Sequence, residues 1–205
     1  MLLLCLSQSF VAPWARSVQG RTSLLRMGDP NEVLKPERPS RDPARNVIGT
    51  PLECCCADVH GSGIGTGFFR DGFCSTGFQD EGRHTVCIEA TEAFLAVSAA
   101  VGNPLHQAIP EHHFPGVRPG DCWCLCASRY AQLLELDANG GVRNQEGKRI
   151  EGFVPKIYLQ ATHEKTLEHV PLETLLERAI DGDDARVELA RLNQLRKKME
   201  KSVKL

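Results

Sequence analysis

The sequence predicts an α+β fold: a single compact domain with a small mixed or antiparallel sheet, packed helices and long loops rich in proline and glycine. The length of 205 residues fits one domain with appendages. Short β-rich runs and amphipathic helical segments both occur along the chain. The long connections 104–120 and 139–152 contain the prolines and glycines typical of loops.

The expected elements follow one another over residues 46–182, which we assign to the folded domain. Residues typical of strands occupy 47–48, 67–72, 84–88, 121–127 and 156–161, and the second of these ends at an Asp-Gly turn. Helices are expected at 92–101, capped by Thr91 and closed by Gly102-Asn103, and at 128–136. Thr162 is placed to cap the segment after the last strand. A further helix follows Pro171, and an added amphipathic helix is expected over 183–205.

The first 45 residues differ from the rest and are expected to form a targeting leader and a disordered linker. Arginines and hydroxyl residues occur with no acid before Asp29, which is typical of organelle import sequences. Phe10-Val11-Ala12-Pro13 resembles the phenylalanine-led motif of transit peptides in algae with complex plastids. We therefore expect plastid (chloroplast) import, with the mitochondrion or the cytoplasm as alternatives.

Composition and charge exclude some classes of partner. The formal net charge of −2 gives no global basic field, so nucleic acid is not expected as a partner. No apolar run approaches the roughly 20 residues that span a bilayer. The C-terminal helix carries an apolar stripe beside a basic end, so self-association is one reading and a solvated helix the other.

The densest group of reactive side chains lies in the expected strand 121–127, where Cys122, Cys124 and Cys126 alternate with Trp123 and Leu125. Successive side chains of a strand face opposite sides, so the three cysteines share one face. Residues two apart lie roughly 6.6 Å apart, too far for a disulfide within the strand. Two such thiols can instead share a metal ion or pair with a cysteine elsewhere. Nine cysteines, an odd number, in a chain of this size favour reduced thiols or metal ligands over a disulfide framework.

One reading of these residues is a reactive thiol, which requires a nearby cation or a helix N-terminus. Cys126, at the junction between strand and helix and three residues before Arg129, is the first candidate, and Cys74 is the second. His163 is the candidate general base, with Glu164 to orient it. His84 is a further candidate.

The second reading is a metal site with a zinc-like ion, for which the candidate ligands are Cys74, His84, Cys87, Cys124 and Cys126. None of these stands in a spacing specific for zinc, and Cys55 and His163 are further partners to consider. His84 and Cys87, three apart, can face one side of a strand only if the backbone bulges between them. The competing hypothesis is a non-catalytic module that binds a ligand or a protein and whose cysteines are buried core residues. The residues do not decide whether the protein is an enzyme.

Several segments together resemble the DUF2237 family of uncharacterised proteins. They lie in order over about residues 46–180: NVIG (46–49), PLE (51–53), GFFRDGFCSTG (67–77), HTVC (84–87), GN (102–103), FPGVRPGDCWCLCASR (114–129) and LQATHEKTLEHVPLE (159–173). The family has no established activity, so the resemblance supplies no reaction.

The resemblance does sort the cysteines. Five stand at positions that match family cysteines: Cys55, Cys74, Cys87, Cys124 and Cys126. Cys54, Cys56 and Cys122 are local additions, and Phe73 stands where the family commonly has a second adjacent cysteine. Further residues match the family motifs and imply a site rather than packing alone: Arg70, Asp71, His84, Asp121, Trp123, Arg129, Thr162, His163 and Glu164.

Overall fold

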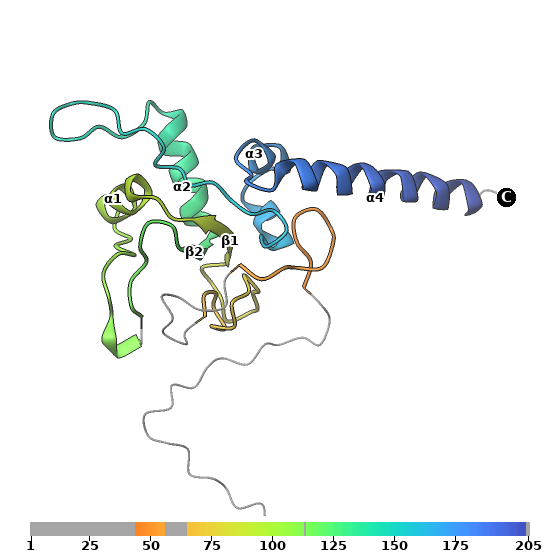
Figure 1. The fold of residues 1–205 in the computed structure, drawn as a ribbon, viewed down its shortest axis with the longest axis horizontal. Helices are drawn as coiled ribbons and strands as arrows, with labels where there is room; N and C mark the ends of the chain where they lie inside the picture. Colours follow the sequence, from red (N-terminus) through yellow and green to blue (C-terminus); the bar gives the residue numbers. More distant parts are fainter. Residues whose placement is uncertain (1–43, 56–64, 113, 204–205) are drawn as a thin grey trace, which may run out of the picture. The chain divides into compact units, whose positions relative to one another are not determined.

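The computed structural model describes residues 44–55, 65–112 and 114–203, all within one compact unit, Lys35–Leu205. The expected leader therefore lies outside the described residues, apart from its last two positions. The elements run in the order β1 (His84–Glu89), α1 (Glu92–Ala100), η1 (Pro110–His112), β2 (Cys122–Cys126), α2 (Ala127–Ala138), η2 (Glu164–Glu168), α3 (Leu172–Glu177) and α4 (Gly182–Val203) (Figure 1). The predicted α+β fold in a single compact domain is confirmed.

The sheet of the described residues consists of β1 and β2, paired antiparallel. Cys87 pairs with Cys124 and Ile88 with Trp123, but the register shifts between His84 and Val86. This β-bulge at Thr85 places His84 opposite Cys126. The bulge is the irregularity that would let the side chains of His84 and Cys87 face the same side of the strand.

The two helices that pack near the sheet begin where the sequence indicates. The side chain of Thr91 accepts a hydrogen bond from Phe94 N at the start of α1, and Gly102, with φ of 83°, follows its C-terminal end. Helix α2 continues directly from β2, with Cys126 as its N-cap residue. Arg129 joins the two helices, because its Nη1 donates to the carbonyl of Val101 at 3.3 Å.

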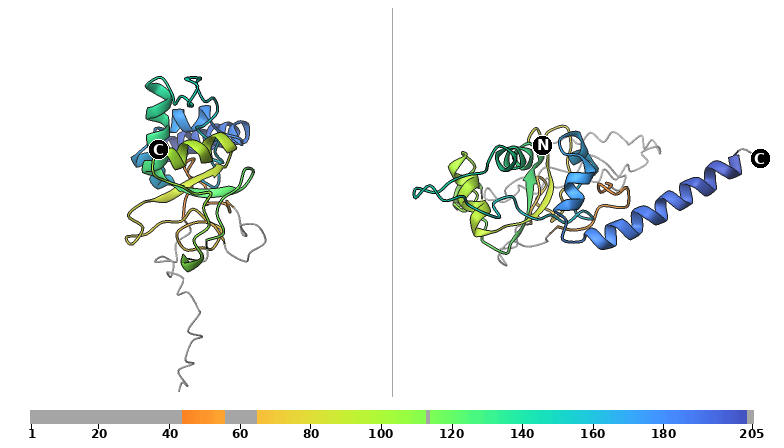
Figure 2. Two further views of the ribbon diagram at one scale, coloured as in Figure 1. Left: turned by 90° about the vertical axis from the view of Figure 1, so that its left-hand side faces the viewer. Right: turned by 90° about the horizontal axis from the view of Figure 1, so that it is seen from above.

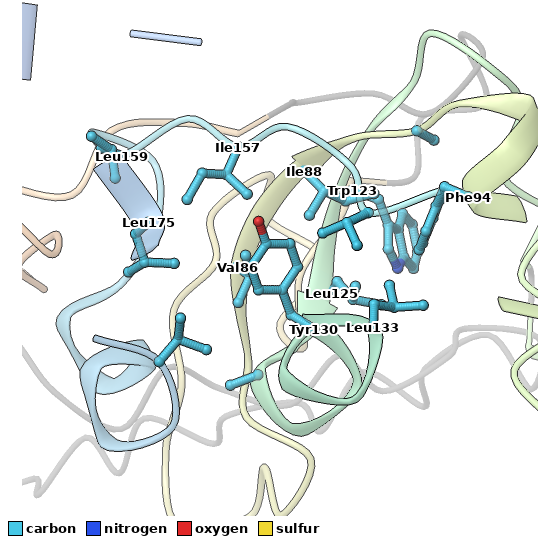
Figure 3. Close-up of a cluster of buried hydrophobic side chains, with 14 of the residues drawn as sticks. Val86, Ile88, Phe94, Trp123, Leu125, Tyr130, Leu133, Ile157, Leu159 and Leu175 are labelled. Atoms are coloured by element: carbon cyan, nitrogen blue, oxygen red, sulfur yellow. The ribbon is translucent and has the colours of Figure 1, made fainter. Parts of the chain in front are cut away.

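The main core lies between the sheet and α2. Figure 3 shows Val86, Ile88, Trp123 and Leu125 of the strands gathered with Tyr130 of α2. Tyr130 is fully buried, and its hydroxyl donates to the carbonyl of Pro155 at 3.2 Å. The face of β2 that carries Trp123 and Leu125 is therefore a core face, as the alternation of the sequence predicts.

Three expected strands are not strands. Residues 47–48 form a turn. In 156–161, Ile157 forms only isolated bridges, to Ile88 and to Ala179. The amides of Leu159 and Gln160 donate instead to the carboxylate of Asp181, at 2.8 and 3.0 Å, so no ladder continues. The segment 67–72 is a series of turns in which Arg70 has a φ of 57°.

Helix α4 runs away from the sheet and from α1 and α2 (Figures 1 and 2). Ala185 is fully buried and Leu189 packs on the core, but Val187 and Met199 are 71% and 70% exposed. None of the described helices is both long enough and apolar enough to cross a membrane.

Candidate thiol site

Cys126 lies at the junction of two elements, as the last residue of β2 and the N-cap of α2. Its thiol is outside any disulfide and is partly exposed. The first turn of α2 contains no acidic residue, and no side chain caps the helix. A helix N-terminus carries partial positive charge, so the sulfur occupies a position that favours an anion.

His84 faces this cysteine from the first position of β1. The bulge at Thr85 sets the two residues opposite each other in the sheet, and both line the same cavity. The Nδ1 of His84 is 2.6 Å from Oδ1 of Asp80, a carboxylate whose side chain is completely buried. Because Asp80 occupies Nδ1, Nε2 is the ring nitrogen left for the sulfur.

Asp80 is held firmly enough to orient the imidazole. Its Oδ2 accepts hydrogen bonds from the backbone N of His84, at 2.8 Å, and from Oγ1 of Thr76, at 2.9 Å. Burial works to raise the pKa of this carboxyl, but the hydrogen bonds and the charge of His84 outweigh burial and lower it. Asp80 is thus an ionised carboxylate behind the imidazole at neutral pH.

The charge of His84 follows from the same contacts. Burial works to lower its pKa, yet the hydrogen bonds and charges of Asp80 and Cys126 outweigh burial and raise the pKa to about 9. The imidazole is therefore protonated at neutral pH.

The turn before His84 is shaped to admit these two side chains. A Cβ on Gly82 would lie 3.1 Å from Sγ of Cys126 and 3.3 Å from Cε1 of His84, tighter than ordinary contact. Arg83 has a φ of 52°, in the left-handed region that a side chain other than glycine rarely adopts. Strained backbone of this kind concentrates at functional sites, where the surrounding structure holds it.

A cavity of about 240 Å³ opens beside Cys126 and His84. Its other lining residues are one cation, one amide and a set of apolar side chains: Arg70, Asn103, Leu105, Ile109, Phe114, Trp123 and Leu125. The guanidinium of Arg70 stacks over the ring of Trp123 at 5.2 Å and over that of Phe114 at 6.0 Å. A thiol, an imidazole and a guanidinium thus border one small space.

Four other cysteines form two disulfides, Cys55–Cys87 and Cys74–Cys124. Cys74, Cys87 and Cys124 are fully buried, and the register of the sheet sets Cys87 beside Cys124. The expectation that the cysteines are reduced thiols or metal ligands is wrong for these four in this structure. Cys74, the second candidate nucleophile, is therefore bonded to Cys124 and not available as a thiol.

The sulfurs of the two disulfides nevertheless lie close together. Those of Cys55, Cys74 and Cys124 are within 4.8 Å of one another, and this is the one group of potential metal ligands of that kind among the described residues. The candidate ligands His84 and Cys126 are not part of it. Of the five predicted ligands, Cys74 and Cys124 belong to this group, whereas His84 and Cys126 lie beside the cavity. Cys87 is linked to the group through its disulfide to Cys55.

His163 does not join Cys126. It is the N-cap residue of η2, where its Nδ1 accepts a hydrogen bond from the backbone N of Lys165 at 3.0 Å. Burial lowers its pKa, which suits a neutral ring that accepts this bond. Glu164 is exposed in the first turn of η2, and its backbone N donates to the carbonyl of Arg45. The role predicted for this pair, general base and orienting acid, has no support in these contacts.

Other polar residues of the family motifs also maintain the fold. Asn46 is buried, and its Nδ2 donates to Oγ1 of Thr50 and to the carbonyls of Pro51 and Gln160. Thr162 bonds to the backbone of Cys87 and Tyr158 rather than capping a helix. Arg129 connects α1 to α2 and does not line the cavity. Much of the polar set is thus structural.

The residue that the sequence did not identify is Asp80. A carboxylate four positions before a histidine, across a glycine turn, is a weak signal that only the fold completes. Arg70 was recognised as part of a motif, but its place in the cavity depends on the turns of 67–72.

One family model matches the chain over residues 45–179, with the description "Uncharacterized protein conserved in bacteria (DUF2237)". No curated protein matches the chain in sequence. The match spans the sheet, α1, α2, η2 and α3, and it includes Asp80, His84 and Cys126. The chain is therefore a member of the DUF2237 family of uncharacterised proteins.

Proposed function

We propose that the protein carries a reactive-thiol site in which Cys126 is the nucleophile, His84 exchanges the proton and Asp80 orients the imidazole. The observation that carries the proposal is that His84 is paired with Cys126 across the sheet, contacts Asp80 through Nδ1 at 2.6 Å, and borders an open cavity together with Cys126. A nucleophile, a base and a group that orients the base are the elements of covalent catalysis by cysteine.

The chemistry of such a site is attack by sulfur on an electrophilic carbon. The thiolate forms an S–C bond while the bond from carbon to the leaving group breaks, and the imidazolium of His84 supplies a proton to that group. Hydrolysis then releases the product as His84 accepts a proton from water and the S–C bond breaks. Asp80 keeps one tautomer and one orientation of the ring through both steps.

The test is the rate of alkylation of each thiol by iodoacetamide, measured peptide by peptide without reductant. Cys54 is the internal control. It is an exposed residue, and the pKa of its thiol is raised, first by partial burial of the sulfur and second by the charge of Asp71. At neutral pH we expect Cys126 to react at least about tenfold faster than Cys54, a difference of about 1.4 kcal/mol in the activation barrier.

The matched variant is His84→Gln, which should reduce the Cys126 rate about tenfold and leave the Cys54 rate unchanged. Two results would contradict the proposed site: equal alkylation rates at the two cysteines of the unmodified protein, or a Cys126 rate that His84→Gln does not change.

A second candidate function concerns the four disulfide cysteines in their reduced form. Three of their sulfurs lie within 4.8 Å of one another, and the fourth is bonded to one of the three. Sulfurs of a tetrahedral zinc site, with Zn–S bonds of about 2.3 Å, are roughly 3.8 Å apart. In a reducing compartment these cysteines would form a structural S₄ site for zinc.

Zinc content measured together with a thiol count distinguishes the two states of this cluster. One zinc per chain with four extra thiols, and loss of stability in a chelator, supports the metal. Two intact disulfides without dependence on a chelator favour structural cysteines, which is also what a non-catalytic binding module would contain.

We also propose that the leader directs the protein to the plastid. We expect residues 1–45, fused to a fluorescent protein, to direct it to the plastid, because the segment is basic and rich in hydroxyl residues and has the Phe10-led motif. Delivery to the mitochondrion or retention in the cytoplasm would contradict this.

A further inference from the structure

We propose that the cavity beside Cys126 takes a small organic acid: a molecule with a carboxylate that Arg70 binds and an electrophilic carbon that the sulfur attacks. This deepens the proposed function and rests on it. Arg70 and the other walls of the cavity determine which molecules reach the thiol.

Arg70 is fixed in place rather than loosely exposed. Its backbone is in the left-handed region, with φ of 57°, and its N donates to the carbonyl of Gly67 at 3.2 Å. The neighbouring glycine Gly65 leaves no room for a side chain, because a Cβ there would lie 2.6 Å from the carbonyl oxygen of Arg70. The guanidinium lies over the rings of Trp123 and Phe114. A preorganised guanidinium of this kind loses little freedom when it binds a ligand.

No carboxylate of the described residues forms an ion pair with Arg70, and burial lowers its pKa. A partly buried cation without an anionic partner is costly, and an anionic ligand removes that cost. Guanidinium groups bind planar carboxylates through two parallel hydrogen bonds.

The charges that line the cavity favour an anion as well. The two cationic side chains are Arg70 and His84, and no aspartate or glutamate is among the lining residues. Asp80 is completely buried and its charge is matched by the imidazolium of His84. These groups leave one positive charge in excess while Cys126 is a thiol, and their charges balance when Cys126 is a thiolate; in both cases Arg70 is the cation that the carboxylate of a ligand can pair with.

The remaining walls set the size and polarity of the ligand. They are mostly apolar, with the amide of Asn103 as the other polar group. The volume of about 240 Å³ is equivalent to roughly eight water molecules at about 30 Å³ each. This fits a short acid with a small apolar body rather than a nucleotide or a peptide.

The experiment compares two alkylating agents that differ only in charge, iodoacetate and iodoacetamide. Both form the same S–CH₂ bond and release iodide. We expect the ratio of the iodoacetate rate to the iodoacetamide rate to be at least about tenfold higher at Cys126 than at Cys54 in the same chain. Salt should reduce this preference, because exposed charges are screened over roughly 8–10 Å.

Two variants locate the cause. Arg70→Met keeps an unbranched apolar side chain but removes the guanidinium and its charge, so it should abolish the preference while iodoacetamide still reacts rapidly. Arg129→Met is the control, because Arg129 is close to Cys126 in sequence but binds Val101 and Gln132 outside the cavity; it should keep the preference.

The outcomes separate this inference from the proposed function. Slow reaction of Cys126 with iodoacetamide overturns the thiol site itself. Rapid reaction with iodoacetamide but no preference for iodoacetate, or an equal effect of the two arginine variants, overturns the organic-acid inference and leaves the thiol site standing.

Discussion

Replacing Asp80 with asparagine removes one charge from the interior while keeping the shape of the side chain. In the unmodified protein the carboxylate accepts hydrogen bonds from the ring and the backbone of His84 and from Thr76. Asparagine retains an acceptor for the neutral donors but does not stabilise an imidazolium. We therefore expect Asp80→Asn to lower the pKa of His84 and to destabilise the fold at the pH values where His84 is charged.

The magnitude follows from the contacts of His84. Its pKa rises from the ordinary 6.5 to about 9, and one pKa unit corresponds to about 1.4 kcal/mol. The full rise would amount to about 3 kcal/mol, but Cys126 shares it and the side chain is 34% exposed to screening by solvent. We expect a loss of about 1–2 kcal/mol, or roughly 3–6 °C in Tm for a chain of this length.

The dependence on pH has a definite sign. A raised pKa in the folded state contributes stability that is complete below the unfolded value of 6.5 and disappears as pH rises through about 9. The lowered pKa of Asp80 contributes stability above its unfolded value of 3.8. The difference between the two proteins should be largest near pH 5–6.5 and should narrow above pH 9.

Urea denaturation at a series of pH values measures this difference. Asp183→Asn is the control, because Asp183 is fully exposed on α4 and its ion pair with Arg186 is worth little. A loss that does not vary with pH, or no loss for Asp80→Asn, would refute the ionic link between Asp80 and His84.

Three further predictions concern other parts of the molecule. Gly82→Ala places a Cβ 3.1 Å from Sγ of Cys126, so alkylation of Cys126 should slow several-fold while Cys54 is unaffected; an unchanged rate would contradict the close fit. The disulfides span sequence separations of 32 and 50. Reducing each should lower the free energy of unfolding by about 4 kcal/mol, and Tm should fall by about 10 °C or more. A Tm that reductant does not change but a chelator lowers would favour the zinc site. Removing residues 194–205 should change the free energy of unfolding by less than about 1 kcal/mol, because nearly all the described residues there are exposed. If sedimentation shows a dimer and this truncation converts it to a monomer, the chain self-associates through α4.

Local signals accounted for much of the fold. The cap at Thr91 and the glycine after α1 fixed that helix, and the alternation of Trp123 and Leu125 identified the core face of β2. The segment 156–161 shows the limit of such signals. Its composition is that of a strand, but Asp181, more than twenty residues later, accepts its amide hydrogens. Composition does not reveal such a competitor.

The site was predicted in part for a physical reason. The position of Cys126 between strand and helix is local and was expected, whereas its partner depends on the bulge at Thr85, which alternation along an ideal strand excludes. Asp80 was missed because its role depends on where the chain folds back. The pairing of Cys55 with Cys87 and of Cys74 with Cys124 is equally a matter of three dimensions, since spacing does not determine connectivity.

The central claim is that His84 activates the sulfur of Cys126, and the ultraviolet absorbance of the thiolate tests it most directly. The difference spectrum between the unmodified protein and Cys126→Ser isolates this one sulfur across a pH titration. We predict thiolate absorbance at neutral pH that disappears in His84→Gln. No thiolate absorbance at neutral pH, or the same absorbance in His84→Gln, would contradict the account.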